Sequence, residues 1–586
     1  MVASWEEIEN ALEIRIPESD DLIFEESRRL TGPGLLWNYP GAVVDILINN
    51  FEISHVTNTW QEITRYLLDD IGWSKQHIIV RHYDGGASLA ISAPMDALYS
   101  AVFAVETSWQ LCASKLLDQK PDSYETMVND LKAIIAKEAN PTLIDLMKVA
   151  GDHGIDIISD DDDVSIGHGT GSKVWPVLNV PAASDINWVE LHDVPVALIT
   201  GTNGKTSSVR LSSAIARAAG KVAGLTSTDF IRVGDDILDH GDYSGPGGAR
   251  MLLRDKRLEI AFLEVARGGI LRRGLPIRRA RAALVTNVAA DHLGQYGINT
   301  VEELAGVKLS VHRALSDDGV FVLNADDDLI IQEATNIDAN ICWFSLDENS
   351  PQISEAKSNG KLCAWMTGNT LIYFDGKAEI SVIDIHDIPL AMGGAALYNV
   401  RNALGALCLA FAMGTDLKAI RMGLSEFKSS PKDNPGRCNE FHINGARVFV
   451  DFAHNPHSIE AVTTALGNLA GNRRFLMVGH AGDRSDDDIK ELVRGAFGFR
   501  PDYVIANENP TYLRGRELGE IPDLVREECI SQGLSDSDVL YADDTADGVR
   551  KVLNGIREGD IALMLVLADR DKAFQLIDEA TKKGEA

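Results

Sequence analysis

Short apolar runs alternate with stretches of helical periodicity from about residue 192 to the end of the chain. The runs lie at 196–200, 258–263, 282–288 and 320–323, and then at 447–450, 475–478, 503–506 and 561–566. Strand-length apolar runs separated by helical stretches are typical of parallel, doubly wound sheets with helices on both faces. The polar, proline-containing segment 429–437 separates the two series and is predicted to be a hinge. We therefore predict an α/β chain with a central domain at 192–434 and a C-terminal α/β domain at 435–586.

The first part of the chain has a different pattern and predicts a smaller α+β domain at 1–160. The apolar run 78–80, followed by a Gly-Gly pair at 85–86, predicts a strand and a turn. After Pro94, apolar residues recur on one helical face, at Leu98, Val102, Val105 and Trp109. Four successive aspartates at 160–163 then begin a polar stretch, which predicts an exposed linker at 161–191. A solvated acidic loop is favoured there over a metal site.

Length and charge narrow the classes of function. With 586 residues the chain is too long for one hydrophobic core, so about three domains are expected. It has 55 basic and 87 acidic residues and a formal net charge of −32, which repels nucleic-acid backbones and anionic membranes. An acidic surface that keeps the protein soluble explains the same charge.

Targeting and cysteine patterns point to the cytoplasm. The sequence shows no signal-peptide pattern and no run of about 18 apolar residues. Its six cysteines stand singly, which argues against a zinc ribbon or a disulfide framework. We expect a cytoplasmic protein that binds neither nucleic acid nor membrane, and homo-oligomerisation stays open.

The segment ITGTNGKTSS at 199–208 has the pattern of a phosphate-binding loop. It follows a predicted buried strand and precedes a helix that extends to about Gly220. Glycines let backbone N–H groups converge on phosphate oxygens, and a helix N-terminus adds its positive dipole end. Lys205 supplies a cation for the terminal phosphates, and the Thr206 hydroxyl can hold Mg²⁺. The predicted nucleotide-binding residues here are Gly201, Thr202, Asn203, Gly204, Lys205, Thr206 and Ser207.

The short form GTNGKT resembles the loop of the Mur ligase superfamily, and further motifs follow in the order of that superfamily. LEVARGGILRRG at 263–274 is similar to the segment whose Glu, here Glu264, binds Mg²⁺, and TNVAADHLGQYG at 286–297 resembles the segment with a metal-site histidine, here His292. The resemblance implies catalytic roles for Lys205, Glu264, His292 and Lys308, and a Mg²⁺ site formed by Thr206, Glu264 and His292.

Lys308 has two interpretations. It lies on a helix that opens with a capping box at 300–303, in the place where many Mur ligases carry a carbamylated lysine. Position alone favours a solvated surface lysine. The histidine motif 16 residues upstream shifts the balance to the functional interpretation, and the resemblance then implies a carbamylated Lys308.

Three more segments resemble the adenosine side of Mur ligases: LYNVRNALGA at 397–406, PGRCNEF at 435–441 and DFAHNPHS at 451–458. Tyr398 stands where the superfamily's first motif has a histidine. The resemblance implies ATP-binding roles for Asn399, Asn402, Arg437, Asp451, His454 and Asn455. It also implies a mostly parallel central P-loop sheet and a Rossmann-like C-terminal domain.

Within the superfamily, the segments at 226–250, 264–275 and 288–294 resemble the Mur-ligase-like part of cyanophycin synthetases. The first 160 residues are more loosely similar to the N-terminal domain of those enzymes. Their ATP-grasp domain, which extends an aspartate backbone, is missing between the two parts. The resemblance therefore implies at most the second chemistry of those enzymes, the joining of an amine to a side-chain carboxylate.

The implied activity is an ATP-dependent ligase that joins a small carboxylate, of aspartate type or another amino acid, to an amino acid or amine through an acyl phosphate. The substrates are expected near Thr228, Asp229, Ser244, Arg267, Asp483, Arg484, Arg514 and Arg516. For the charged residues of the C-terminal domain, ordinary surface charge is an equally good interpretation. Two alternatives stay open: a non-catalytic nucleotide-binding partner of a separate ATP-grasp enzyme, and a P-loop kinase, which explains the loop but not the three adenosine-side segments.

Overall fold

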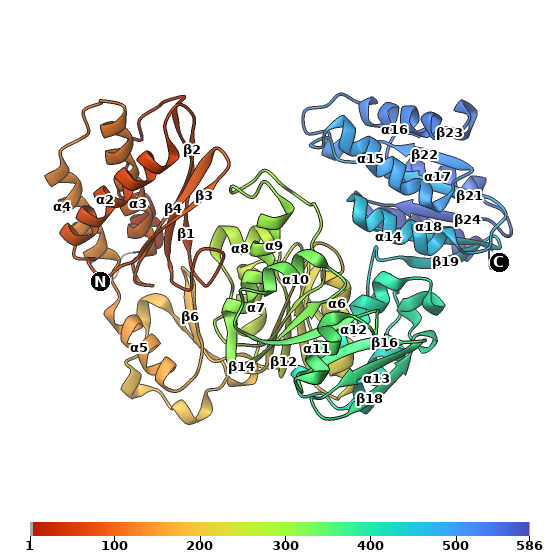
Figure 1. The fold of residues 1–586 in the computed structure, drawn as a ribbon, viewed down its shortest axis with the longest axis horizontal. Helices are drawn as coiled ribbons and strands as arrows, with labels where there is room; N and C mark the ends of the chain where they lie inside the picture. The colour runs from red at the N-terminus through yellow and green to blue at the C-terminus, as the bar shows by residue number, and fades with distance from the viewer. Residues whose placement is uncertain (1–3, 585–586) are drawn as a thin grey trace.

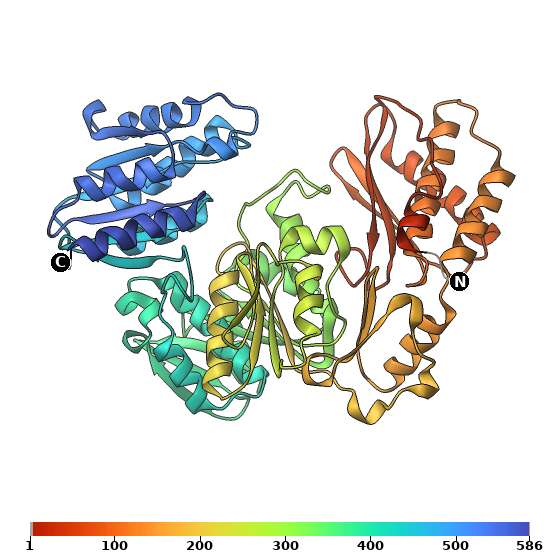
Figure 2. The same cartoon turned by 180° about the vertical axis from the view of Figure 1, so that it is seen from behind.

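The computed structural model describes residues 4–584 and has two domains on either side of a central one (Figures 1 and 2). The N-terminal domain is an antiparallel sheet in the order β1 (Leu22–Leu30), β2 (Gly41–Ile48), β4 (Gly86–Ser92), β3 (Ile78–Tyr83). Its helices are α1 (Trp5–Glu9), α2 (Ile53–Asp70), α3 (Leu98–Leu116) and α4 (Tyr124–Glu138). Trp60 of α2 and Trp109 of α3 are fully buried in the core that these helices share with the sheet.

The predicted linker at 161–191 and the residues just before it contain regular structure. Helix α5 (Pro141–Asp152) leads into a three-stranded antiparallel sheet of β5 (Ile157–Ser159), β6 (Asp163–Ile166) and β7 (Lys173–Pro176). The acidic run is the turn between β5 and β6, and arginines neutralise it: Asp160 pairs with Arg254 at 2.7 Å and Asp161 with Arg29 at 2.8 Å. Asp160 and Asp161 therefore fasten this small sheet to its neighbours, while Asp162 is exposed, as expected for a solvated loop.

The central domain is built on an eleven-stranded sheet in the order β11-β10-β9-β12-β8-β13-β14-β15-β16-β17-β18. Strands β9, β12, β8, β13, β14, β15 and β16 are parallel, and antiparallel hairpins extend both edges. The strands are β8 (Val196–Thr200), β9 (Ala223–Thr226), β10 (Phe230–Val233), β11 (Asp236–His240), β12 (Ile260–Glu264), β13 (Ala280–Val285), β14 (Leu315–Asn324), β15 (Asn340–Ser345), β16 (Cys363–Thr367), β17 (Thr370–Phe374) and β18 (Glu379–Asp384).

Helices cover both faces of this sheet. They are α6 (Lys205–Ala218), α7 (Pro246–Leu253), α8 (Arg267–Arg273), α9 (Val301–Leu309), α10 (Asp328–Ala334), α11 (Pro351–Ser358), α12 (Leu397–Ala412) and α13 (Leu417–Glu426). Side chains of β8 alternate between two cores, with Ile199 in the cluster that contains Val209 of α6 and Leu198 in the cluster that contains Leu252 of α7. A strand buried on both faces carries an unbroken apolar run, which is why β8 is recognisable in the sequence.

The C-terminal domain has a six-stranded sheet in the order β19-β20-β24-β21-β22-β23, parallel except for the β19–β20 hairpin. Its strands are β19 (Asn439–Ile443), β20 (Ala446–Asp451), β21 (Arg474–Val478), β22 (Tyr503–Asn507), β23 (Val539–Ala542) and β24 (Ile561–Leu565). Its helices are α14 (Pro456–Gly467), α15 (Asp486–Ala496), α16 (Glu520–Ser531), α17 (Thr545–Gly555) and α18 (Arg570–Gly584). The predicted fold class is thus confirmed. Among residues 4–584, no helix is both long and apolar enough to cross a membrane.

Candidate active site

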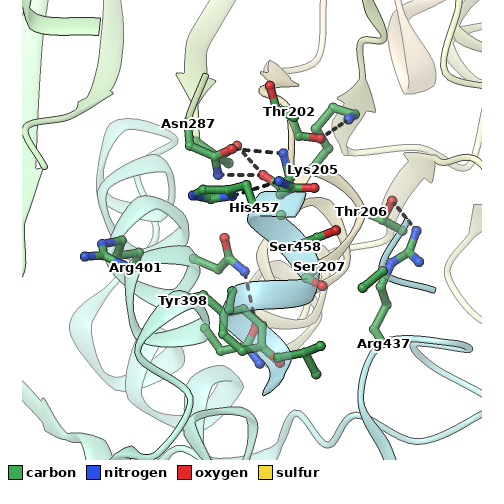
Figure 3. Close-up of a pocket in the computed structure, with 18 of the residues that line it drawn as sticks. Thr202, Lys205, Thr206, Ser207, Asn287, Tyr398, Arg401, Arg437, His457 and Ser458 are labelled. Carbon is green, nitrogen blue, oxygen red and sulfur yellow. Dashed lines mark hydrogen bonds between the residues drawn. The ribbon is translucent and has the colours of Figure 1, made fainter. Parts of the chain in front are cut away.

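The loop between β8 and α6 has a conformation that depends on its glycines. Gly201 and Gly204 have φ angles of +144° and +84°. A Cβ atom on Gly204 would lie 2.3 Å from Oδ1 of Asn402, and one on Gly201 would lie 1.9 Å from Oγ1 of Thr286. Both glycines are therefore required by backbone conformation and by close packing. The loop and the start of α6 line a cleft of about 300 Å³ between the central and C-terminal domains (Figure 3).

Three charged or polar side chains meet at the start of α6. The Lys205 Nζ donates to the carbonyl oxygens of Gly201 at 3.0 Å and Thr202 at 2.9 Å, so the ammonium group lies against the loop. The Thr206 hydroxyl donates to Oε2 of Glu264 at 2.9 Å. Oε1 of the same carboxylate is buried and has no hydrogen-bond partner among the described residues. Burial raises the pKa of Glu264, while the nearby Lys205 lowers it.

A free oxygen on a buried carboxylate next to a threonine hydroxyl fits a hard divalent cation. Mg²⁺ binds oxygen ligands and is held in nucleotide sites by one or two protein groups together with phosphates. Thr206 and Glu264 are suited to be those groups. The ion would also compensate a carboxylate that burial otherwise disfavours in its charged form.

His292 lies in a second cluster, with Asp291 and His454. Single ligand atoms of these three residues lie within 4.8 Å of one another. Burial raises the pKa of Asp291, but His292, His454 and nearby lysines outweigh this effect and hold it below its usual value. Arg484 approaches the same carboxylate, with Nη2 3.6 Å from Oδ1. The central domain provides His292 and Asp291, and the C-terminal domain provides His454 and Arg484. This cluster therefore forms where the two domains meet.

Lys308 is buried beneath the phosphate-binding loop. Its Nζ donates to the Gly201 carbonyl oxygen at 2.8 Å, and only 3% of the residue is exposed. Burial, together with the neighbouring Lys205, lowers the pKa of Lys308 well below its usual value. A solvated surface lysine, the alternative left open by the sequence, does not describe this position.

Residues of α12 and α14 also line the cleft. Asn402 Nδ2 donates to Oδ1 of Asn399 at 3.1 Å, and Asn399 Nδ2 donates to the Leu390 carbonyl at 3.0 Å. Tyr398 also lines the cleft, and its buried hydroxyl has no partner within the described part of the chain. Figure 3 shows Tyr398 well away from Thr202 and Asn287, so the cleft extends from the loop toward α12.

The C-terminal domain closes the cleft with polar groups. Asp451 accepts hydrogen bonds from the N–H groups of Cys438 and Ala453, both at 2.7 Å, and burial raises its pKa to about 6. Arg437 lies beside Thr206, with Nη2 3.4 Å from Oγ1 (Figure 3). Asn455 and Asn203 exchange two amide hydrogen bonds, at 3.2 and 3.0 Å. The tip of the phosphate-binding loop is thereby joined to the N-terminus of α14.

Asp229, predicted to contact substrate, is engaged by two arginines. Arg210 of α6 donates to its Oδ2 at 2.5 Å, and Arg570 of α18 donates to its Oδ1. The Arg210 side chain is fully buried, and burial lowers its pKa to about 10, so it remains charged at neutral pH. Asp229 thus connects the central domain to the C-terminal domain through opposite charges.

We expect Asp229→Asn to reduce the free energy of unfolding by about 3–5 kcal/mol, because it leaves the buried Arg210 without its counter-charge. Urea unfolding followed by circular dichroism measures the change. Asp235→Asn is the control, because the Arg217–Asp235 pair has an aspartate side chain that is 87% exposed. Exposed pairs contribute about 0–1 kcal/mol, so equal losses in the two variants would contradict the assignment.

The remaining predicted substrate residues are spread around the domain junction. Thr228 lines the cleft, and Ser244 is buried with its hydroxyl on Asp242. Arg267 donates to Oε1 of Gln295 at 2.7 Å. In the C-terminal domain, Asp483 pairs with Arg514, and Arg516 pairs with Asp486 at 2.7 Å.

Several residues of the site were not predicted from the sequence, among them Asn287 and Arg401, which line the cleft. Asp291 precedes the predicted histidine, so its motif could have indicated it. Arg570 has no local signal, because its partner Asp229 lies 341 residues away, and Arg210, 19 residues from Asp229, lies in no motif that indicates the contact. His457, whose Nδ1 accepts from Asn203 Nδ2 at 2.9 Å, lies inside a quoted motif without a role having been assigned to it.

Comparison with known proteins identifies two consecutive domains. Residues 199–410 match the Mur ligase middle domain, and residues 436–566 match the domain described as Mur ligase, glutamate ligase domain. A cyanophycin synthetase of Crocosphaera subtropica is 38% identical over 340 residues, which are 58% of this chain and 38% of that protein. A UDP-N-acetylmuramoyl-L-alanyl-D-glutamate–2,6-diaminopimelate ligase of Listeria innocua is 27% identical over 65% of this chain and 74% of its own length.

The structural comparison agrees at the level of the fold. E. coli FolC, solved in complex with ADP and without folate substrate, is 19% identical with a TM-score of 0.50, and covers 66% of this chain and 89% of its own. The chain spans about two fifths of the length of the curated cyanophycin synthetases that it matches. Because two successive domains of one family account for more than half of its residues, the chain belongs to the Mur ligase family.

Proposed function

We propose that this protein is an ATP-dependent ligase that joins a carboxylate to an amine through an acyl phosphate. The observation that carries the proposal is the cleft between the central and C-terminal domains. It combines a glycine-dependent phosphate loop, Lys205, and a buried carboxylate with one free oxygen beside the Thr206 hydroxyl. No nucleophilic side chain is needed, because the substrate's own carboxylate attacks the phosphate.

The residues of the cleft suit the charges of that reaction. Lys205 and the N–H groups at the start of α6 bind the terminal phosphates of ATP and stabilise the charge that develops on them. Thr206 and Glu264 hold Mg²⁺, which when bound neutralises phosphate oxygens. Arg437 is placed beside Thr206 to contact phosphate or ribose, and Asp451 is placed to accept from ribose hydroxyls. Asn399 and Asn402 face the adenine end.

Two bond exchanges follow. A carboxylate oxygen of the first substrate forms a bond to the γ-phosphorus as the bond to ADP breaks. The amine nitrogen of the second substrate then forms a bond to the acyl carbon, phosphate leaves with that carboxylate oxygen, and the nitrogen loses a proton. The roles of His292, Lys308 and the substrate residues Thr228, Ser244, Arg267, Asp483, Arg484, Arg514 and Arg516 belong to this proposal, as does carbamylation of Lys308.

The substrates proposed are a small carboxylate, of aspartate type or another amino acid, and an amino acid or amine. The similarity to cyanophycin synthetases supports this class. We also propose the division into domains at 1–160, 192–434 and 435–586, with 161–191 as the connection, and a cytoplasmic location.

The proposal is tested by incubating the full chain with ATP, Mg²⁺ and a panel of carboxylates paired with amines, while phosphate release is measured. We expect ADP and phosphate to form only when both members of an accepted pair are present. With an ¹⁸O-labelled carboxylate, one labelled oxygen should appear in the released phosphate. A stable phosphorylated product from a single substrate would indicate a kinase. ATP binding without turnover across the panel would favour the alternative of a nucleotide-binding partner for a separate enzyme.

A further inference from the structure

The loop between β13 and α9, which carries Asp291 and His292, has an unusual backbone. His292 and Tyr296 have φ angles of +49° and +57°, and Gly294 and Gly297 have φ angles of +88° and +61°. A left-handed conformation costs a non-glycine residue about 1–2 kcal/mol. Such residues persist only where the surrounding structure imposes them. The contacts of this loop with its surroundings therefore decide whether His292 stays next to Asp291 and His454.

The N-terminal domain provides the contacts at the tip of the loop. Arg81 of β3 donates from Nη1 to the Tyr296 carbonyl at 3.3 Å and from Nη2 to the Gly297 carbonyl at 2.6 Å. A Cβ atom on Gly297 would lie 2.2 Å from the ring of Tyr83, so β3 and the loop are packed as closely as a glycine permits. One guanidinium group thus fixes the two carbonyls that lie next to each other in the left-handed segment.

The Tyr296 side chain is held on two further sides. The Arg28 guanidinium of β1 lies over its ring, 4.7 Å from the centroid, and Arg272 of α8 donates to its hydroxyl at 2.7 Å. Arg28 also donates from Nε to the Leu271 carbonyl at 2.9 Å, which fastens β1 to α8. Figure 1 shows β1 and β3 beside α8 and α9.

Arg81 also contacts the helix that carries Lys308. Its Nη2 lies 3.3 Å from Oε1 of Glu303, the residue that completes the capping box of α9 with Thr300. On the same helix, Lys308 reaches the Gly201 carbonyl under the phosphate loop. The loop with His292 and the helix with Lys308 are therefore both fastened to one side chain of the N-terminal domain.

We propose that the N-terminal domain sets the position of the active-site loop, and that Arg81 is the residue through which it does so. Arg81 touches no residue of the nucleotide cleft, so it acts as a positioning residue through the loop 291–298 and α9. The expected effect of Arg81 on turnover rests on the proposed ligase function. The expected effect of Arg81 on the conformation of the loop does not depend on that function.

Arg81→Met tests the proposal, with Arg65→Met as the matched control. Arg65 of α2 also donates to two carbonyls, those of Ser74 at 3.2 Å and Gln76 at 3.0 Å, but both lie within the N-terminal domain.

With an accepted substrate pair, we expect Arg81→Met to lower kcat by between about tenfold and a hundredfold, because the reacting groups are misplaced. The KM for ATP should stay within about twofold of the wild-type value, because the nucleotide site is intact. Arg65→Met should leave both constants near those of the wild type. Arg81→Lys, which keeps the charge but not the two-pronged geometry, should lie between them.

Hydrogen exchange measured by mass spectrometry separates this inference from the proposed function. Arg81→Met should speed exchange in peptides covering 289–299, while peptides covering β24 in the C-terminal domain stay at wild-type protection. Unchanged exchange in 289–299, or the same increase in Arg65→Met, would overturn the role of Arg81 even if the wild type is an active ligase. Faster exchange confined to 289–299 would support that role even if no substrate pair is turned over, an outcome that counts against the proposed function alone.

Discussion

Lys205→Ala is expected to lower turnover of an accepted substrate pair by about 10³-fold, or about 4 kcal/mol of transition-state stabilisation. The variant removes the ammonium group that lies against the carbonyls of Gly201 and Thr202 and lines the cleft, whereas Lys308 contacts the Gly201 carbonyl from beneath the loop. Charge grows on the phosphoryl oxygens as the carboxylate attacks, so an ammonium group at this point contributes most in the transition state. Phosphate release under saturating ATP measures the loss.

Lys221→Ala is the matched control for this variant. Lys221 follows the other end of α6, has a side chain that is 55% exposed, and lies 3.7 Å from Glu259. Its removal should change turnover by less than about twofold, since exposed ion pairs contribute little. If Lys205→Ala retained full activity in the cell, phosphoryl chemistry would not be the role of this cleft, and the nucleotide-binding partner would become the better interpretation.

Glu264→Gln should raise the Mg²⁺ concentration that the reaction needs and lower its rate by about 10²–10³-fold. The amide has the same shape and can still accept from the Thr206 hydroxyl, but it offers the cation no negative charge. Since burial disfavours the charged form of Glu264, the thermal midpoint of the ligand-free variant should equal or exceed that of the wild type. Adding Mg²⁺ and ATP should then stabilise the wild type more than the variant.

Glu259→Gln provides the comparison, because Glu259 directly precedes the same strand but faces Lys221 at the surface. We expect Glu259→Gln to keep a rate near that of the wild type. The assignment of Glu264 would fail if Glu264→Gln needed no more Mg²⁺ than the wild type, or if it lost activity by unfolding, with a thermal midpoint well below that of the wild type.

In the central and C-terminal sheets, the strands that the sequence predicts are those buried on both faces, whereas the strand predicted at 78–80 belongs to β3, a partly buried edge strand of the N-terminal sheet. The run 196–200 coincides with β8, and 561–566 nearly coincides with β24, because only unbroken apolar runs satisfy two cores. The hairpin strands at the edges were not predicted. β11, for example, is exposed along its whole length, so its sequence carries no apolar pattern.

The residues of the candidate site likewise include some that the sequence predicts and some that it does not. The phosphate loop is a local feature, and its strand, glycines and helix can all be recognised within ten residues of sequence. Contacts between distant segments leave no such signal. Asp229 was predicted as a substrate residue from the resemblance, and nothing in its neighbourhood in the sequence indicates its contact with Arg570. The grouping of His292 with Asp291 and His454, apart from Thr206 and Glu264, likewise arises only when the domains come together.

The amide pair between Asn203 and Asn455 bears on how the two domains can move apart. These two bonds join the tip of the phosphate loop to the C-terminal domain. Any separation of the domains at this point breaks both bonds, and closure of the domains re-forms them. Both partners are uncharged amides, so we expect this contact to depend little on ionic strength.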